Sequence, residues 1–384
     1  MDFEFSQDQV MLRDLAREFL RERCTSAHVR AMMDDPAGYD RAMYRQLGEM
    51  SLLGLAIPER FGGSGLGMVE QAIVLEEMGR VAYPGPFVPS VVLAATAIQA
   101  SGDEAAMARY LPGLASGELT MSFALLEHEI GWGPEVVAMR AVPDGDGFVL
   151  SGEKRFVPFG QAVDIVVVVA RTGDAPGEVS LFAVPRDAAG LTVQPYKMFD
   201  LNAKECALRF DNVRVPGDAL IGTLNGGAGP LDAVVQRAAV AACAEMLGCA
   251  RTSLEMSVEY AKVRKQFGQP IGSFQAIKHK CAEMLGATEN AHSATYYAAW
   301  ALDANAPDAR LAVSVAKSFV NEAARKVCGD AIQVHGGIGF TWEYDLHFYF
   351  KRAKYLEPLW GDTAWHRERV LDEVLAGRVA GAAR

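Results

Sequence analysis

Residues 163–170 read Val-Asp-Ile-Val-Val-Val-Val-Ala, a nearly continuous β-branched run in the middle of the chain. β-Branched side chains favour strands, and further strand-like segments surround this one at residues 148–150, 180–184, 191–194 and 207–215. Turn residues separate the segments, as in VPDGDG at residues 142–147, and Pro216-Gly217 ends the set. The pattern predicts a mostly antiparallel β-domain over residues 119–225.

Helical patterns lie on both sides of this region. Before it, Ser6 and Gln9 have the spacing of a capping box at the start of a helix. After it, Ile277, Cys281 and Leu285 recur at i, i+4 and i+8, and residues 231–264, 311–332 and 345–354 add three more helical segments. Four such helices would pack as a bundle. The predicted fold is therefore α+β in three parts: an N-terminal helical domain (1–118), a middle antiparallel β-domain (119–225) and a C-terminal four-helix bundle (226–384).

Composition narrows the class of protein. The 384 residues are 50% hydrophobic and 22% charged, which is typical of a globular chain with a large core. A net charge of −11 argues against nucleic acid as a partner, because phosphate binding needs a basic surface. The apolar run at residues 165–170 is far shorter than the roughly 20 residues that cross a bilayer. With an acidic N-terminus unlike a secretory signal, these features predict a cytoplasmic protein without a membrane partner.

The six cysteines form no Cys-x-x-Cys pair and lie mostly in apolar, helical-looking surroundings. We therefore expect reduced thiols, with neither a disulfide framework nor a metal site.

Five short strings carry the functional signal. They are GLAIPERFGG at 54–63, YLP at 110–112 with ASGE at 115–118, LSGEK at 150–154, YAKVRKQFG at 260–268 and QVHGGIG at 333–339. In this order and spacing they resemble the acyl-CoA dehydrogenase family over essentially the whole chain. The resemblance implies FAD as cofactor, an acyl-CoA substrate dehydrogenated between its α and β carbons, and an electron-transfer flavoprotein or similar acceptor. It also implies a tetramer built as a dimer of dimers, in which chains of one or two kinds share the cofactor sites.

The last two strings are the expected FAD contacts. An arginine fork suits a pyrophosphate, an aromatic ring can cover an adenine or flavin face, and glycines let the backbone approach a phosphate. The resemblance assigns the first group of contacts to Arg264, Gln266 and Phe267, and a second group, across a dimer interface, to Gln333, Gly336 and Gly337. The alternative is two ordinary helix ends, with Phe267 in the core and the glycines as C-caps. His335 is interpreted as structural.

The expected contacts to the flavin ring are incomplete. Leu126 and Pro158 stand where the family places threonines that hydrogen-bond the ring system. Each missing hydrogen bond would contribute about 1 kcal/mol. Phe156 keeps an aromatic side chain that could stack on the flavin or fill the β-domain core. We therefore expect the β-domain of this chain to hold a flavin ring poorly.

The catalytic base also departs from the family. The family's α-proton acceptor is usually a glutamate near the C-terminus, and Trp360 occupies that position here. Asp362 lies two residues on, where the family has a threonine that contacts the cofactor, so Asp362 is a candidate for both roles. Glu245 is the only charged residue within 238–250, close to a second position, near Ala238, where some members carry the base. A buried, unpaired carboxylate would gain basicity; alternatively Glu245 pairs with a cation from another helix, or a partner chain supplies the base.

These departures resemble the hetero-oligomeric members of the family, some of which act on bulky acyl chains such as steroid side chains. Two rival functions remain open. One is a non-catalytic subunit that completes a site with a homologous chain, and the other is a flavin-dependent monooxygenase on the same fold.

Overall fold

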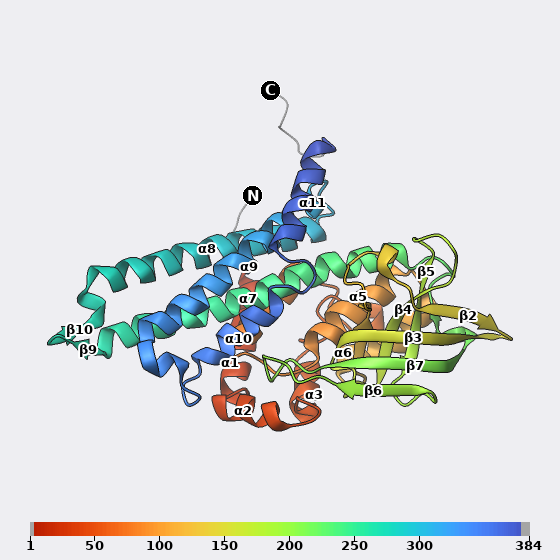
Figure 1. The fold of residues 1–384 in the computed structure, drawn as a ribbon, viewed down its shortest axis with the longest axis horizontal. Helices are drawn as coiled ribbons and strands as arrows, with labels where there is room; N and C mark the ends of the chain where they lie inside the picture. Colours follow the sequence, from red (N-terminus) through yellow and green to blue (C-terminus); the bar gives the residue numbers. More distant parts are fainter. Residues whose placement is uncertain (1–3, 378–384) are drawn as a thin grey trace. The chain divides into compact units, whose positions relative to one another are not determined.

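The computed structural model describes residues 4–377 (Figure 1). The chain divides into two compact units, each described here by itself. Unit 1 contains Met1–Val29, Met68–Tyr83 and Ala239–Arg384, and unit 2 contains Arg30–Gly67 and Pro84–Ala238. Segments from the first hundred residues therefore contribute to both units.

Unit 2 is built on one eight-stranded sheet in the order β6-β7-β3-β2-β4-β5-β8, with β1 paired to β4. All pairings are antiparallel except those of β4 with β1 and with β2. The β-branched run forms β4, whose central residues are fully buried, so the predicted, mostly antiparallel sheet is confirmed. The strands are β1 (Met121–Ala124), β2 (Arg140–Asp144), β3 (Gly147–Pro158), β4 (Ile165–Arg171), β5 (Val179–Pro185), β6 (Leu191–Pro195), β7 (Glu205–Pro216) and β8 (Leu220–Ile221).

Helices complete unit 2. They are α3 (Arg41–Glu49), the π-helical segment η2 (Val88–Ala94), α5 (Ala95–Ala100) and α6 (Glu104–Ser116), while α2 (Ser26–Asp34) spans the division between the units. The glycine-rich connection at 54–63 is a tight turn. A Cβ on Gly63 would lie 2.0 Å from the Ile57 carbonyl oxygen, so only glycine fits there.

Unit 1 is helical. Its elements are α1 (Gln7–Arg23), α4 (Met68–Arg80), most of α7 (Ala228–Val263), α8 (Gln275–Asp303), α9 (Ala309–His335), α10 (Leu346–Leu356) and α11 (Thr363–Leu375). The capping box expected at the start of α1 is present, with Ser6 and Gln9 each bonding the other's backbone amide. In the C-terminal part, α8, α10 and α11 each pack against α9. The fourth expected helix, α10, has only 11 residues, and α11 was not expected.

α4 and α7 cross in direct backbone contact. A Cβ on Gly79 would lie 2.1 Å from the Glu245 carbonyl oxygen, and a Cβ on Gly248 would lie 2.1 Å from the Glu76 carbonyl oxygen. Real Cβ atoms do not approach backbone oxygens this closely. The two glycines therefore let the helices approach more closely than any larger residue would allow.

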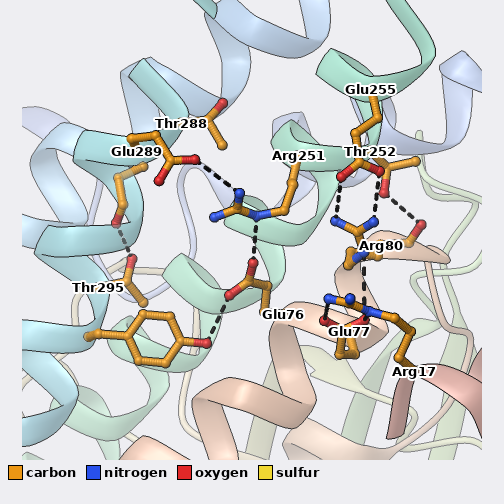
Figure 2. Close-up of polar contacts among 12 residues, drawn as sticks. Arg17, Glu76, Glu77, Arg80, Arg251, Thr252, Glu255, Thr288, Glu289 and Thr295 are labelled. Atoms are coloured by element: carbon orange, nitrogen blue, oxygen red, sulfur yellow. Dashed lines mark hydrogen bonds and ion pairs between the residues drawn. The ribbon is translucent and has the colours of Figure 1, made fainter. Parts of the chain in front are cut away.

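A buried carboxylate lies beside this crossing (Figure 2). Arg251 of α7 donates to Glu76 of α4 at 2.8 Å and to Glu289 of α8 at 3.0 Å. The Tyr296 hydroxyl donates to the other oxygen of Glu76 at 2.8 Å, and burial raises the pKa of that hydroxyl well above its ordinary value. A buried carboxylate is tolerated when its oxygens are bonded in this way.

A second cluster holds the other side of α4 (Figure 2). Arg17 of α1 makes two hydrogen bonds to the buried Glu77, at 2.9 and 2.6 Å. Arg80 pairs with Glu255 of α7 at 2.7 Å, and the Thr252 hydroxyl donates to the Arg80 carbonyl at 3.0 Å. The two clusters join α1, α4, α7 and α8 into one polar framework around the glycine contact.

Burial explains two features of the composition. α7 is long and apolar enough to cross a membrane by length and composition, yet 78% of its most apolar window is buried inside the structure, as in a core helix. The six cysteines form no disulfides, and all are buried except Cys281, which is half-buried. The expectation that the thiols lie in the core is therefore confirmed for five of the six.

The glycine contact generates a stability test. We expect Gly248→Ala to lower the free energy of unfolding by about 2 kcal/mol, because the new methyl group forces α7 away from α4. Urea unfolding measures the change. Gly286→Ala in α8 is the matched control, since a Cβ there meets no atom within 4 Å and alanine should add up to about 1 kcal/mol. Equal effects of both substitutions would contradict the contact.

Candidate active site

The first expected cofactor string lies at the C-terminal end of α7. Residues 265–270 form a small hairpin of β9 (Lys265–Gln266) and β10 (Gln269–Pro270). Phe267 lies at its tip with φ of +52° and a side chain 93% exposed, and Arg264 and Gln266 are also exposed. Phe267 is therefore not a core residue, and the alternative of an ordinary helix end with Phe267 in the core does not hold. The string presents a cation, an amide and an aromatic ring to solvent.

The second expected string ends α9. Gln333 is exposed in the last helical turn, and Gly336 leaves the helix with φ of +63°. A Cβ on Gly336 or Gly337 would meet no atom within 4 Å, so nothing within the subunit requires glycine at 337. The backbone at this turn is open to an incoming group. That is the geometry in which glycine serves close approach of a ligand.

His335 brings the two strings together. Its ring stacks on Tyr260 of α7 at 4.3 Å between centroids, and Tyr344 lies at 5.1 Å on a tilted plane. Its Nδ1 contacts the Ala331 carbonyl at 2.8 Å, and burial lowers its pKa. The contacts are those of a structural histidine, and they place the ends of α7 and α9 side by side in unit 1.

An apolar groove opens beside the hairpin. Its volume is about 490 Å³, and Pro270 and Gly272 form one wall while Ile277 and Cys281 of α8 form another. Lys262 and Lys278 contribute the cations. Apolar walls with nearby cations suit the adenine and diphosphate portion of a dinucleotide. The residues at this end of unit 1 therefore fit that part of FAD.

The expected ring-contact positions lie in unit 2, with Leu126 after β1 and with Phe156 and Pro158 on β3. Phe156 on β3 has φ of +50°, an exposed side chain, and a tilted contact with Tyr196 at 5.2 Å between centroids. Leu126 is buried, and its carbonyl accepts from the Arg155 amide at 2.8 Å. Pro158 has only its backbone carbonyl for hydrogen bonding, and this carbonyl accepts from the Ser122 hydroxyl. Neither Leu126 nor Pro158 has a side-chain donor for a flavin ring.

The backbone around these positions is nevertheless firmly held. Lys154 is fully buried and pairs with Glu127 at 2.6 Å, and it also donates to the Leu125 carbonyl at 3.0 Å. Glu127 accepts from the amides of Ala138 and Met139. Burial lowers the pKa of Lys154 to about 8, against the opposing charge of Glu127. The backbone beside the expected ring-contact positions is therefore held by buried hydrogen bonds.

Glu245 lies at the α4–α7 crossing and is paired. Its carboxylate accepts from Arg352 of α10 at 3.2 Å, and the two side chains are 12% and 7% exposed. The same Arg352 nitrogen also donates to the Tyr83 carbonyl at 3.2 Å. A guanidinium in contact stabilises the charge of the carboxylate. The geometry matches the structural alternative, in which Glu245 pairs with a cation from another helix.

Asp362 begins α11. Its carboxylate accepts the Trp365 amide at 2.8 Å, which is the contact of an N-cap residue, and its side chain is exposed. Trp360 is buried with φ of +60°, and His366 Nε2 contacts its carbonyl at 2.9 Å. Asp362 therefore has a sufficient structural role, and Trp360 offers no proton acceptor.

Comparison with known proteins decides the family. The chain matches the N-terminal domain of acyl-CoA dehydrogenases over residues 6–118, the middle domain over 122–213 and the C-terminal domain over 227–375. This chain belongs to the acyl-CoA dehydrogenase family. It is 32% identical over 366 residues to a probable acyl-CoA dehydrogenase of Bacillus subtilis, covering 93% of this chain and 95% of the relative. The chain is accordingly an acyl-CoA dehydrogenase, a flavoprotein-class oxidoreductase.

Two solved structures of this family are also similar. One is a variant of the Tcur3481–Tcur3483 steroid acyl-CoA dehydrogenase, with 31% identity, a TM-score of 0.86 and coverage of 97% of this chain and 98% of that one. The other is the ChsE4–ChsE5 complex from Mycobacterium tuberculosis, with 28% identity, a TM-score of 0.88 and coverage of 98% and 99%.

Several residues that organise this acyl-CoA dehydrogenase escaped sequence reasoning. Arg352, the partner of Glu245, lies 107 positions away, and Lys317 of α9 is fully buried. Both are cations on apolar helix faces; Val313 and Val320, for example, flank Lys317 at i−4 and i+3. A cation on an apolar helix face indicates from sequence that the side chain is buried and bonded, but it does not identify the group that accepts its hydrogen bonds.

The Glu245–Arg352 pair generates a test of role. We expect Glu245→Gln to lower the free energy of unfolding by about 3 kcal/mol, because the buried Arg352 guanidinium loses its contact with a charged carboxylate, with only a modest loss of turnover. Glu255→Gln on the same helix is the control, since Glu255 is half exposed and its pair with Arg80 contributes little. Turnover reduced by orders of magnitude in a protein of normal stability would instead make Glu245 the base.

Proposed function

We propose that this chain is one subunit of an FAD-dependent acyl-CoA dehydrogenase that assembles with a homologous chain and acts on a bulky acyl thioester. One observation carries the proposal. The string that holds the cofactor's diphosphate end in the family is intact and exposed at one end of unit 1, whereas the ring-contact positions in unit 2 hold Leu126 and Pro158. A chain that keeps the diphosphate contacts but lacks side-chain donors for the flavin ring is suited to sharing its cofactor with a different chain.

In this proposal Arg264 and the open backbone at Gly336 and Gly337 bind the diphosphate, Gln266 and Gln333 add amide contacts, and Phe267 covers an aromatic face. Bound FAD would supply the acceptor for the hydride that leaves the substrate β-carbon. A carboxylate would take the substrate α-proton, and an electron-transfer flavoprotein or a similar acceptor is the proposed partner.

A partner chain is the proposed source of the base. Within this chain, Trp360 replaces the usual glutamate, Glu245 is held by Arg352 and Asp362 caps α11. Asp362 remains the best-exposed carboxylate of the two candidates. The same observations favour a second candidate function, a non-catalytic subunit that completes the site of its partner.

The proposed substrate is an acyl-CoA with a bulky, steroid-like chain. Support comes from likeness to the steroid acyl-CoA dehydrogenase and to the two-protein complex, both matched along almost the whole chain.

The cofactor assignment predicts weaker flavin retention in two variants. Arg264→Ala removes a charge-assisted fork and should cost about 1.5–3 kcal/mol of binding. Gly337→Val should weaken binding by blocking approach to the backbone, without crowding the subunit itself. Flavin absorbance after gel filtration measures occupancy. Gly286→Val, also in open space, is the control, and unchanged occupancy in both test variants would refute the assignment.

Assembly predicts the flavin content of the purified protein. Expressed alone, the chain should hold less than one FAD per subunit, because its own ring contacts are depleted. Co-expression with a homologous chain that carries the two threonines and the glutamate should restore full occupancy and dehydrogenation of steroid-side-chain thioesters in preference to short straight ones. A fully loaded and fully active homotetramer would contradict the shared site. Restored flavin without any effect of variants in this chain on turnover would favour the non-catalytic role.

A further inference from the structure

Lys317 is a buried cation that neither the family strings nor the polar framework uses. It lies on α9 with no exposed surface. Its ammonium donates to Asn321 Oδ1 at 2.6 Å, to the carbonyls of Leu356 and Glu357 at 3.1 Å each, and to the Gly361 carbonyl at 3.3 Å. An ammonium has three protons, so these four acceptors saturate it. Three of the four belong to one short stretch of backbone.

That stretch is the connection between α10 and α11. Leu356 and Glu357 are at the C-terminal end of α10, where helix carbonyls lack intrahelical partners and the helix dipole favours a cation. Gly361 immediately precedes Asp362, the N-cap of α11. Lys317 therefore fixes both ends of residues 356–361 from outside the loop.

The loop itself has a demanding conformation. Trp360 and Gly361 have φ of +60° and +105°, and a Cβ on Gly361 would lie 2.4 Å from the Trp365 ring. A non-glycine residue in the left-handed region is strained and persists only where its surroundings hold it. His366 of α11 holds the Trp360 carbonyl from one side, and Lys317 holds the neighbouring carbonyls from the other.

Core packing alone does not account for this lysine. Burial lowers its pKa to about 8, which means that the protein interior disfavours its charge. The titratable groups that face it are the Cys243 thiol of α7, the carboxylates of Glu357 and Asp362, and His366 of α11. None of its four hydrogen-bond acceptors is a carboxylate: three are backbone carbonyls and one is the amide oxygen of Asn321. A methionine would fill similar space without the cost of burying a charge.

We propose that Lys317 is a positioning residue for the dehydrogenation: it fixes the loop at 356–361 and so holds Asp362, the more exposed of this chain's two candidate carboxylates, in a single arrangement. The inference rests on the proposed function, and within it on Asp362 as this chain's candidate proton acceptor. Lys317 acts through the loop and does not itself contact the substrate.

The test combines hydrogen exchange with a half-reaction, using the full-length protein together with its partner chain if it needs one. The variants are Lys317→Met, Asn321→Leu and, as matched control on the same helix, Lys326→Met, whose ammonium bonds the side chains of Asp330 and Glu283. Exchange is followed in peptides covering residues 356–363, and the half-reaction is the bleaching of flavin absorbance by a steroid-side-chain acyl-CoA.

In Lys317→Met we expect exchange in this loop to rise at least tenfold, and flavin reduction to slow at least tenfold while flavin occupancy and the KM for the thioester change less than threefold. Asn321→Leu should give a smaller change in the same direction. If Lys317→Met does not fold, Asn321→Leu alone tests whether Lys317 fixes the loop. Lys326→Met should match the wild type.

Unchanged hydrogen exchange in the loop, or an equal rise in exchange in Lys326→Met, would show that Lys317 does not fix the loop. Faster loop exchange with unaltered flavin reduction would overturn the positioning role and leave Lys317 as a structural residue. Absence of flavin reduction in the wild-type assembly would refute the proposed function. The exchange data would still show whether Lys317 fixes the loop.

Discussion

The helical unit depends on the close approach of α4 and α7 at Gly79 and Gly248. Because each backbone lies where a Cβ would be, neither helix can shift along or rotate about the other without a clash. The polar framework is arranged around this contact, with Glu76 and Glu77 supplied by α4 and their partners by three other helices (Figure 2). Glu245 belongs to the same crossing. Its carbonyl oxygen lies against Gly79, and its side chain accepts a hydrogen bond from Arg352.

The site combines rigid frames with altered contacts. In unit 2 the Lys154–Glu127 pair keeps the backbone of the ring-contact region in place although Leu126 and Pro158 cannot donate from their side chains. In unit 1 Lys317 and His366 hold the loop at 356–361, in which the Trp360 side chain offers no proton acceptor. At both places the backbone is well supported by hydrogen bonds, whereas the side chains of Leu126, Pro158 and Trp360 lack the groups that the resemblance led us to expect.

Local sequence pattern predicted the elements well where they are long or strongly patterned. The β-branched run became β4, and Ser6 and Gln9 formed the expected capping box. α11 was missed because its charged residues obscure a helical stripe. The exposure of Phe267 could not be read from sequence, since an aromatic residue after a helix is compatible with the core and with a hairpin tip. Contacts such as Glu245 with Arg352 join positions far apart in the chain, and no periodicity encodes them.

The exposed end of unit 1 has a consequence for how the protein is made. Phe267, Phe340, Trp342 and Ile338 leave large apolar side chains exposed to water. Such surfaces adhere to other apolar surfaces with little selectivity. A newly made chain is therefore prone to aggregate through this end, and mutual repulsion between copies that each carry a net charge of −11 opposes that aggregation.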